Sequence, residues 1–239
     1  MIQQLTLLDL EPEEREVRQI TYNEAKPFIL NVHYARRMPS ITYAYGLFIN
    51  GRIGGVVTYG VPASNNLCEG LAGKSNKHNV YELNRLVILP TYSGNNNASY
   101  LISHSLKMLP NRTFVVSYAD TAWTHVGYVY QATNWLYTGM TKSRTDVYHP
   151  NGKHPRHSLD YSKEYNMRQT RSPKHRYVYL VGNKRDRKQM IKELNYKIYD
   201  DYPKGDEKRY DVNNPKAPVP MIITDKRTGE KNERKQMGV

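Results

Sequence analysis

The alternation of apolar and polar residues along the chain predicts helices and strands in an order typical of a mixed sheet. The pair Asn50-Gly51, between two β-rich runs, is typical of a two-residue hairpin turn. In chain order, the predicted elements are a helix over 21–37, strands over 43–49 and 53–59, a loop over 62–79, a strand over 80–89, a helix over 98–109, a strand over 113–118 and a helix over 125–137. This order predicts an α/β (α+β) fold, a mixed sheet with flanking helices.

The periodicity weakens after Gly139. A strand over 177–181 and a short basic helix over 184–196 are the elements that the later pattern favours. From residue 202 the composition turns to Pro, Lys, Asp and Asn without a periodic apolar face, which predicts a peripheral or partly disordered tail. These changes divide the chain into a core over 1–140, a basic region over 141–200 that completes the fold, and a tail over 201–239.

The length of 239 residues is enough to bury one sizeable core. The longest apolar runs are far shorter than a membrane span, and the polar, acidic beginning lacks the plan of a signal peptide. The single cysteine, Cys68, excludes an internal disulfide, a zinc ribbon and a paired-thiol redox site. We therefore expect a soluble protein of the cytoplasm with no membrane partner.

The net charge of +13 is unevenly distributed along the chain. Residues 142–192 contain 14 basic and 4 acidic side chains. A polyanion held through several phosphate contacts is the natural partner of such a surface, and 21 tyrosines offer stacking faces for bases. The sequence therefore favours nucleic acid as a partner over a basic surface that serves solubility alone.

The segment 85–101, RLVILPTYSGNNNASYL, is the most specific feature of the sequence. A strand, a turn and a helix beginning near Asn97 present free backbone N–H groups and the positive end of a helix dipole, which can hold a pyrophosphate. An ordinary turn between a strand and a helix is the alternative. The segment resembles the central motif of the GNAT acyltransferase superfamily. The matching residues are Ile88, Pro90, Tyr92, Gly94, Ala98 and Leu101.

The resemblance implies a cofactor site of the coenzyme A type in this turn. The cofactor-binding residues that it implies are Tyr92, Gly94, Ala98 and Ser99. Two positions differ from the family, because Ser93 stands where Arg or Gln is usual and Asn96 where Gly is usual. The loss of a charge-assisted phosphate contact predicts that acetyl coenzyme A binds weakly.

Four further stretches resemble the Mom family of bacteriophage DNA-modification proteins, a divergent branch of the GNAT superfamily. They are GVPAS (60–64), VYELNRL (80–86), VSYAD (116–120) and HVGYVYQATNWLYTG (125–139). The family converts adenine in phage DNA to an N6-carbamoylmethyl derivative, which shields that DNA from host restriction. The resemblance implies an enzyme with double-stranded DNA as its substrate, acting in the cytoplasm of the infected bacterium.

This product poses a chemical difficulty. Acetyl transfer from a thioester would form an amide on N6, whereas the family's product has a saturated carbon there. The donor of the transferred group therefore stays unknown. The resemblance suggests iron as an additional reactive centre, with His33 and Tyr34 among the polar residues that could bind it. For His33, a surface or capping position is the alternative.

The same resemblance implies that Tyr130 is a general acid and that Asp120 belongs to the catalytic group. For Tyr130 the alternative is a core tyrosine at helical spacing, and for Asp120 a cap or turn residue. His125 is a candidate general base, since the unperturbed pKa of histidine is about 6.5, and it could equally cap a helix. Arg85 completes the catalytic group.

The spacing of Glu82 and Arg85 predicts that they point to opposite faces of a regular strand, so that one of them faces the substrate. The tract His149, His154 and His157 lies in a Pro/Lys/Arg-rich loop with irregular spacing, which favours phosphate contact over a metal site.

Three classes of function remain. They are a DNA-modifying enzyme of the Mom type, a conventional N-acetyltransferase of a protein or RNA amine, and a DNA-binding protein on an inactive GNAT scaffold. The sequence leaves the oligomeric state open, with a homodimer as one alternative.

Overall fold

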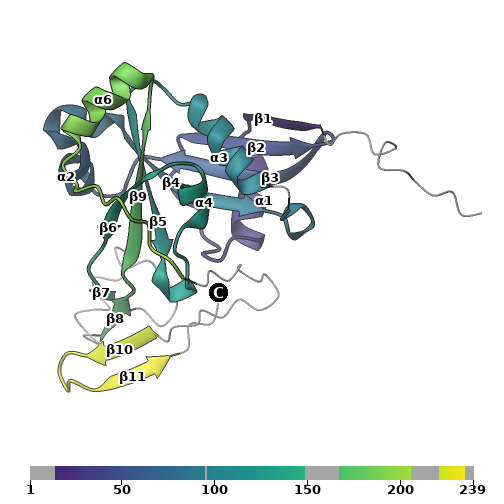
Figure 1. The fold of residues 1–239 in the computed structure, drawn as a ribbon. Helices are drawn as coiled ribbons and strands as arrows, with labels where there is room; N and C mark the ends of the chain where they lie inside the picture. The colour runs from purple at the N-terminus through teal and green to yellow at the C-terminus, as the bar shows by residue number, and fades with distance from the viewer. Residues whose placement is uncertain (1–13, 95, 149–166, 206–220, 235–239) are drawn as a thin grey trace, which may run out of the picture.

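The computed structural model describes residues 14–94, 96–148, 167–205 and 221–234 (Figure 1). The strands are β1 (Arg15–Gln19), β2 (Tyr43–Ile49), β3 (Arg52–Gly60), β4 (Val80–Ile88), β5 (Thr113–Asp120), β6 (Leu136–Met140), β7 (Arg144–Val147), β8 (Met167–Arg171), β9 (Lys174–Val181), β10 (Met221–Asp225) and β11 (Lys231–Arg234). The helices are α1 (Tyr22–Asn31), α2 (Asn65–Asn76), α3 (Asn97–Lys107), α4 (Tyr128–Ala132) and α6 (Lys184–Glu193), with 3₁₀ turns η2 (Lys77–Asn79), η3 (Pro90–Tyr92) and η4 (Thr121–Trp123). None of the described helices is long and apolar enough to cross a membrane.

The strands form two sheets. The main sheet has seven strands in the order β1-β2-β3-β4-β5-β9-β6, and the second has four in the order β11-β10-β8-β7. Among the described strand pairs, β4 and β5 are parallel and the others are antiparallel. Strand β9, which comes from the basic region, lies between β5 and β6 and so completes the main sheet. The predicted fold class, a mixed sheet with flanking helices, is confirmed.

Helices cover both faces of the main sheet, and its strands turn alternate side chains to each face. On one face α3 packs through Leu101, Ile102 and Leu106 against strand residues such as Leu47 and Val57. On the other face α1 packs through Ala25 and Ile29, and α2 and α6 cover the far end. Figure 1 shows α3 and α1 beside β2 and β3, and α2 and α6 at the opposite end of the sheet. The core is therefore split into layers on either side of one sheet.

A β-bulge at Asn84 changes the alternation along β4. Thr58 of β3 pairs with Arg85 and Tyr59 pairs with Leu83, so Asn84 is the extra residue. Its side chain accepts a hydrogen bond from the Thr58 hydroxyl at 2.6 Å and donates one to the Ser40 carbonyl at 2.8 Å. These two contacts fix the bulge.

The predicted hairpin is confirmed. Strands β2 and β3 pair across Asn50 and Gly51, whose φ angles of 47° and 75° are the positive values that a type I′ turn requires. The loop predicted over 62–79 is wrong, because α2 lies inside it. Ser64 caps this helix by accepting the N–H of Leu67, and the buried Cys68 faces the core.

The helix predicted over 125–137 is too long. Gly127 and Asn134 adopt left-handed φ angles of 84° and 59°, so α4 is restricted to the residues between them and β6 follows. The tail predicted from residue 202 contains regular structure over 221–234, where β10 pairs with both β11 and β8. The three histidines of 149–157 lie outside the described residues.

The packing around the bulge gives a test of the fold. A Cβ atom at Gly60 would lie 1.9 Å from the Ser40 carbonyl oxygen. We expect Gly60→Ala to lower the free energy of unfolding by about 3 kcal/mol, because backbone must move. Gly70→Ala is the control, since the nearest atom to its Cβ is the Tyr196 hydroxyl at 3.4 Å. Equal stability of the two variants in chemical denaturation would contradict this packing.

Candidate active site

A cavity of about 830 Å³ opens where β4 and β5 part. The two strands pair only over Val80–Glu82 and Phe114–Val116, and the residues that follow on both strands line the cavity. The carboxyl ends of parallel strands at such a parting are where open α/β sheets place ligands. The predicted site residues that line it are His33, Tyr34, Arg85, Gly94, Ala98, Ser99, His125 and Tyr130. Most of the predicted residues are therefore brought to one place.

Ser117 bridges the parted strands. Its hydroxyl donates to the Leu83 carbonyl at 2.9 Å and is hydrogen-bonded to the Tyr130 hydroxyl at 2.8 Å. The Tyr130 ring is buried and packs on Trp135 and Tyr177, with ring centroids 5.0 and 5.2 Å apart. Tyr130 is therefore a core residue whose hydroxyl group reaches the cavity wall, and its role as a general acid stays a prediction.

Residues 199–205 hold α4 against the sheet. The Tyr202 hydroxyl donates to the Trp135 carbonyl at 2.7 Å, and the Gln131 amide donates to the Pro203 carbonyl at 3.1 Å. A helix of five residues has little stability of its own. The orientation of Tyr130 on α4 therefore depends on contacts from residues 199–205, which lie far along the chain from it.

His33 and Tyr34 follow α1 and lie together at the cavity. Their ring centroids are 4.3 Å apart, and the Tyr34 ring also contacts Trp123 at 5.1 Å and His125 at 5.7 Å. Burial, followed by the charges of Arg85 and His125, lowers the pKa of His33 to about 3. Burial also raises the pKa of Tyr34. Both side chains are therefore neutral near pH 7.

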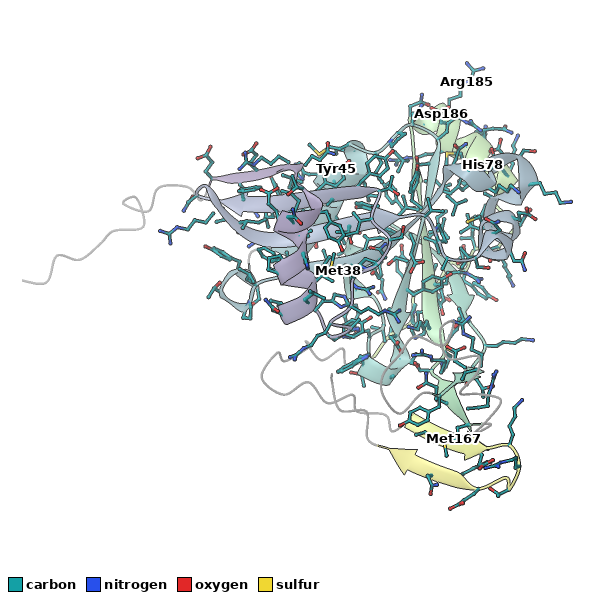
Figure 2. The ribbon with its side chains drawn as sticks, turned by 180° about the vertical axis from the view of Figure 1, so that it is seen from behind. Met38, Tyr45, His78, Met167, Arg185 and Asp186 are labelled. Carbon is teal, nitrogen blue, oxygen red and sulfur yellow. The ribbon has the colours of Figure 1, made fainter. Side chains whose placement is uncertain are left out.

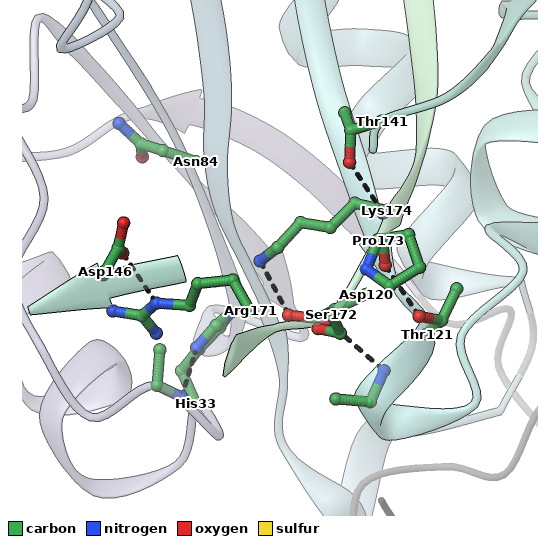
Figure 3. A network of polar contacts seen from close by, with 12 residues as sticks. His33, Asn84, Asp120, Thr121, Thr141, Asp146, Arg171, Ser172, Pro173 and Lys174 are labelled. Carbon is green, nitrogen blue, oxygen red and sulfur yellow. Dashed lines mark hydrogen bonds and ion pairs between the residues drawn. The ribbon is translucent and has the colours of Figure 1, made fainter. Parts of the chain in front are cut away.

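The geometry of His33 does not favour metal binding. Its Nδ1 accepts a hydrogen bond from the Ala35 N–H at 3.0 Å (Figure 3), so the proton of the neutral ring lies on Nε2 and neither nitrogen offers a lone pair. The Tyr34 phenol keeps its proton because burial raises its pKa. Within the described ranges, no three His, Cys, Asp or Glu side chains come together as metal ligands. Iron stays a prediction that these two side chains do not support as they are arranged.

Asp120 is held by three donors beside the cavity (Figure 3). Its Oδ2 lies 2.6 Å from Lys174 Nζ, and its Oδ1 accepts the Ser172 hydroxyl at 2.5 Å and the Ala122 N–H at 3.0 Å. Burial opposes ionisation of Asp120, but Lys174, Ser172 and Ala122 together lower its pKa. The capping alternative is therefore confirmed, and a role as a proton acceptor does not fit.

Lys174 lines the cavity, and sequence reasoning missed it. It begins β9 opposite Asp120, in a register that pairs the two residues directly. Nothing in the local sequence around either residue indicates this partner, because the pairing depends on which strand lies beside β5.

Arg85 and Glu82 lie on the same face of β4. The bulge puts Leu83, Leu86 and Ile88 together against the α3 layer, so the predicted opposition of Glu82 and Arg85 is wrong. The Arg85 guanidinium donates to the Arg37 carbonyl from Nε at 3.2 Å and from Nη2 at 2.8 Å. It forms no ion pair within the described part of the chain, so it brings a positive charge to the cavity.

The turn after β4 leads through η3 to α3, and Gly94, Asn96, Ala98 and Ser99 line the cavity there. Asn96 has a left-handed φ of 57°, a conformation that Asn tolerates better than most residues. Nothing lies within 4 Å of a Cβ built on Gly94. The Tyr92 ring instead packs over Gly54, where a Cβ would lie 2.8 Å from it, and it does not line the cavity. Tyr92 is therefore a packing residue.

Methylcarbamoylase mom of Escherichia phage Mu is 28% identical over 176 residues, which are 72% of this chain and 69% of that protein. Arabidopsis thaliana NAA60, solved with acetyl-CoA, gives a TM-score of 0.46 at 13% identity, over 70% of this chain and 99% of that one. A GNAT-family acetyltransferase from Bacillus cereus gives a TM-score of 0.42 at 11% identity, over 71% of this chain and 99% of that one. The model of the Mom protein family matches residues 14–204, and the chain belongs to that family.

Proposed function

We propose that this protein transfers a carbamoylmethyl group to N6 of adenine in double-stranded DNA. The observation that carries the proposal is the cavity between β4 and β5, which gathers a tyrosine hydroxyl, a carboxyl group and two cations. The name of the phage Mu relative supports the group transferred. Modification of this kind would shield phage DNA from restriction in the cytoplasm of the infected host.

Cations near the cavity support a DNA substrate. Arg144 of β7 and Arg171 of β8 are directly paired, and β8 leads into β9, whose first residue is Lys174. Asp146 lies 2.8 Å from Arg171 and 4.0 Å from Arg144, so it offsets only part of this charge. Like charges opposite each other destabilise a sheet, and a bound phosphate would relieve the repulsion.

The basic stretch 142–192 also places positive charge on α6, away from the second sheet. Figure 2 shows Arg185 on α6 at one end of the molecule and Met167, at the start of β8, at the other. Because Lys174 lines the cavity and follows β8, we assign the DNA contact to the second sheet rather than to α6.

The cavity is large enough to receive an extruded base. Binding pockets for small ligands are roughly 300–1,000 Å³, and this one is about 830 Å³. Adenine N6 is paired inside a duplex, so an enzyme that modifies it must take the base out of the stack. Tyr34, Tyr118 and His125 line the cavity and offer ring faces or edges to such a base.

The proposed reaction is a displacement at carbon. The N6 lone pair forms a bond to the methylene carbon of an acetamide that carries a leaving group, and the bond to the leaving group breaks with its electron pair. N6 loses one proton, and the leaving group gains one from the Tyr130 hydroxyl. Adenine and the donor thus give N6-carbamoylmethyladenine and the protonated leaving group, and no oxidant is required.

A conventional N-acetyltransferase is the second candidate. The left-handed Asn96 and the open space at Gly94 favour it, since together they keep the turn in which related enzymes would hold a pyrophosphate. The two candidates differ in the bond formed, which is an amide in one case and a secondary amine in the other.

The first prediction concerns the product. When the protein is produced in bacteria, mass spectrometry of nucleosides from their DNA should detect N6-carbamoylmethyladenine. Tyr130→Phe should reduce it about 100-fold or more, because proton transfer contributes that much, while DNA affinity is unchanged. Tyr45→Phe is the control, since its hydroxyl contacts the Met108 carbonyl outside the cavity. Unmodified DNA from the wild type would support the inactive DNA-binding alternative.

The second prediction concerns DNA binding. Affinity for duplex DNA should fall steeply between about 50 and 200 mM salt, and the double variant Arg144→Gln/Arg171→Gln should reduce the salt slope by about two. Arg185→Gln/Lys188→Gln removes the same charge from α6 and should leave the slope nearly unchanged. Equal effects of the two double variants in fluorescence titrations would refute the assignment to the second sheet.

The third prediction concerns acetyl coenzyme A. Ser93 cannot supply the charge-assisted phosphate contact of Arg, which typically contributes about 1.5 to 3 kcal/mol, so calorimetry should find weak or no binding. Ser93→Arg should tighten binding roughly tenfold. Low-micromolar binding by the wild type together with N6-acetyladenine as product would establish the second candidate instead.

A further inference from the structure

We infer that Glu82 of β4 is the base that accepts the N6 proton of adenine. The inference rests on the proposed function and adds to it the group that activates the nucleophile. Four observations carry it: the face of β4 on which Glu82 lies, the contacts that its carboxylate lacks, the neighbours that surround it, and the state of the other candidate bases.

The bulge at Asn84 decides which groups meet at the cavity. Without the extra residue, Glu82 and Arg85 would alternate to opposite sides of the sheet. With it, both side chains share the face opposite the Leu83 and Leu86 layer, and both line the cavity. Glu82 also lies at the last paired position of β4, beside Val116 of β5. Its carboxyl group is thus at the point where the strands begin to part.

The Glu82 carboxylate has no hydrogen-bond or ion-pair partner within the described residues. Among the described residues, its oxygens are not in the set of fully buried side-chain atoms that lack a partner, and Glu82 lines the cavity, so these oxygens are open to it. Asp120 is the opposite case, because three donors occupy both of its oxygens. Of these two carboxyl groups, Glu82 alone has free acceptor positions for a substrate proton.

The surroundings of Glu82 suit a base. The charged and titratable groups that face it are Arg85 on the same strand, Lys174 on β9, Tyr118 on β5, Tyr34 after α1 and Cys68 on α2. Burial raises the pKa of Glu82, and this effect exceeds the opposing effect of Arg85 and Lys174. A carboxylate of raised pKa accepts a proton more readily, and the two cations keep its charged form accessible.

Two of the three other candidate bases, His33 and Asp120, are less suited than Glu82. His33 Nδ1 already accepts the Ala35 N–H, and its pKa of about 3 makes it a poor proton acceptor. Asp120 is saturated, and its pKa is lowered. His125 contacts the edge of the Tyr34 ring, and the experiment below separates it from Glu82.

The proton therefore has a defined path. As the bond between N6 and the methylene carbon of the donor forms, the N6–H bond breaks and its proton moves to a Glu82 oxygen. The donor is an acetamide with a leaving group on its methylene carbon, and the leaving group takes a proton from Tyr130. Glu82 thus ends protonated and Tyr130 deprotonated, and proton exchange with water restores both.

The test compares Glu82→Gln with the wild type in the nucleoside assay and in DNA binding. We expect the rate to fall about 100-fold or more, because general-base catalysis contributes that much, while DNA affinity stays within about twofold. Glu16→Gln is the control, because Glu16 lies exposed on β1 and its substitution removes the same charge. A Glu82→Gln rate within about threefold of the wild type would overturn the inference.

The pH dependence adds a second readout. The carboxylate form is present above its pKa, so the wild-type rate should rise with pH through the raised pKa of Glu82 and then level off, whereas Glu82→Gln should show no such rise. If His125→Asn removes the rise and Glu82→Gln retains it, the base is His125 and the inference is wrong.

A binding measurement separates this inference from the proposed function. A duplex in which purine replaces adenine lacks the N6 amino group. The wild type should prefer the adenine duplex, and Glu82→Leu should lose that preference. If the wild type produces no modified adenine, the proposed function fails, and this preference still decides whether Glu82 contacts N6. An unchanged preference in Glu82→Leu would refute the contact.

Discussion

The early parting of β4 and β5 is the constraint on which the rest of the site depends. The two strands share only three paired positions, and the hydroxyl of Ser117 then spans the gap to the Leu83 carbonyl. Backbone groups that lose a strand partner must face water or a ligand, so the parting creates a polar cavity inside an otherwise continuous sheet. The parting also places Tyr130 and Glu82 on opposite sides of the cavity. The proposed reaction requires this separation, because Glu82 takes a proton from N6 while Tyr130 gives one to the leaving group.

The two carboxyl groups near the cavity have opposite environments. Asp120 is ionised and fixed by Lys174, so it joins the end of β5 to the start of β9. Glu82 is half-buried, has no hydrogen-bond or ion-pair partner among the described residues, and has a pKa that desolvation raises. Pairs of acids whose surroundings drive their pKa values apart divide structural and catalytic tasks between them. The cation that stabilises Asp120 also borders the cavity, so the same lysine contributes to both tasks.

The local sequence predicted the elements and residues whose signals lie within a few positions. Asn50-Gly51 determines its turn through two positive φ angles, and the α3 stripe of Leu101 and Leu106 is readable from spacing. The Asn84 bulge was not predictable, because it is fixed by the partners Thr58 and Ser40 on other segments. The pairing of Asp120 with Lys174 and the fixing of α4 by 199–205 likewise depend on tertiary contacts. The sequence thus indicated the candidate residues, but not the face of the sheet on which each side chain lies or the residues that it contacts.

The central claim is that an adenine leaves the duplex and enters the cavity between the parted strands. The most direct measurement uses 2-aminopurine, whose fluorescence rises when it is unstacked, in place of adenine in a duplex. The account predicts a rise in fluorescence when the protein binds, and a much smaller rise with a variant such as Ala119→Trp, which fills the cavity wall on β5. Binding without any rise in fluorescence, at any position of the probe along the duplex, would contradict the account.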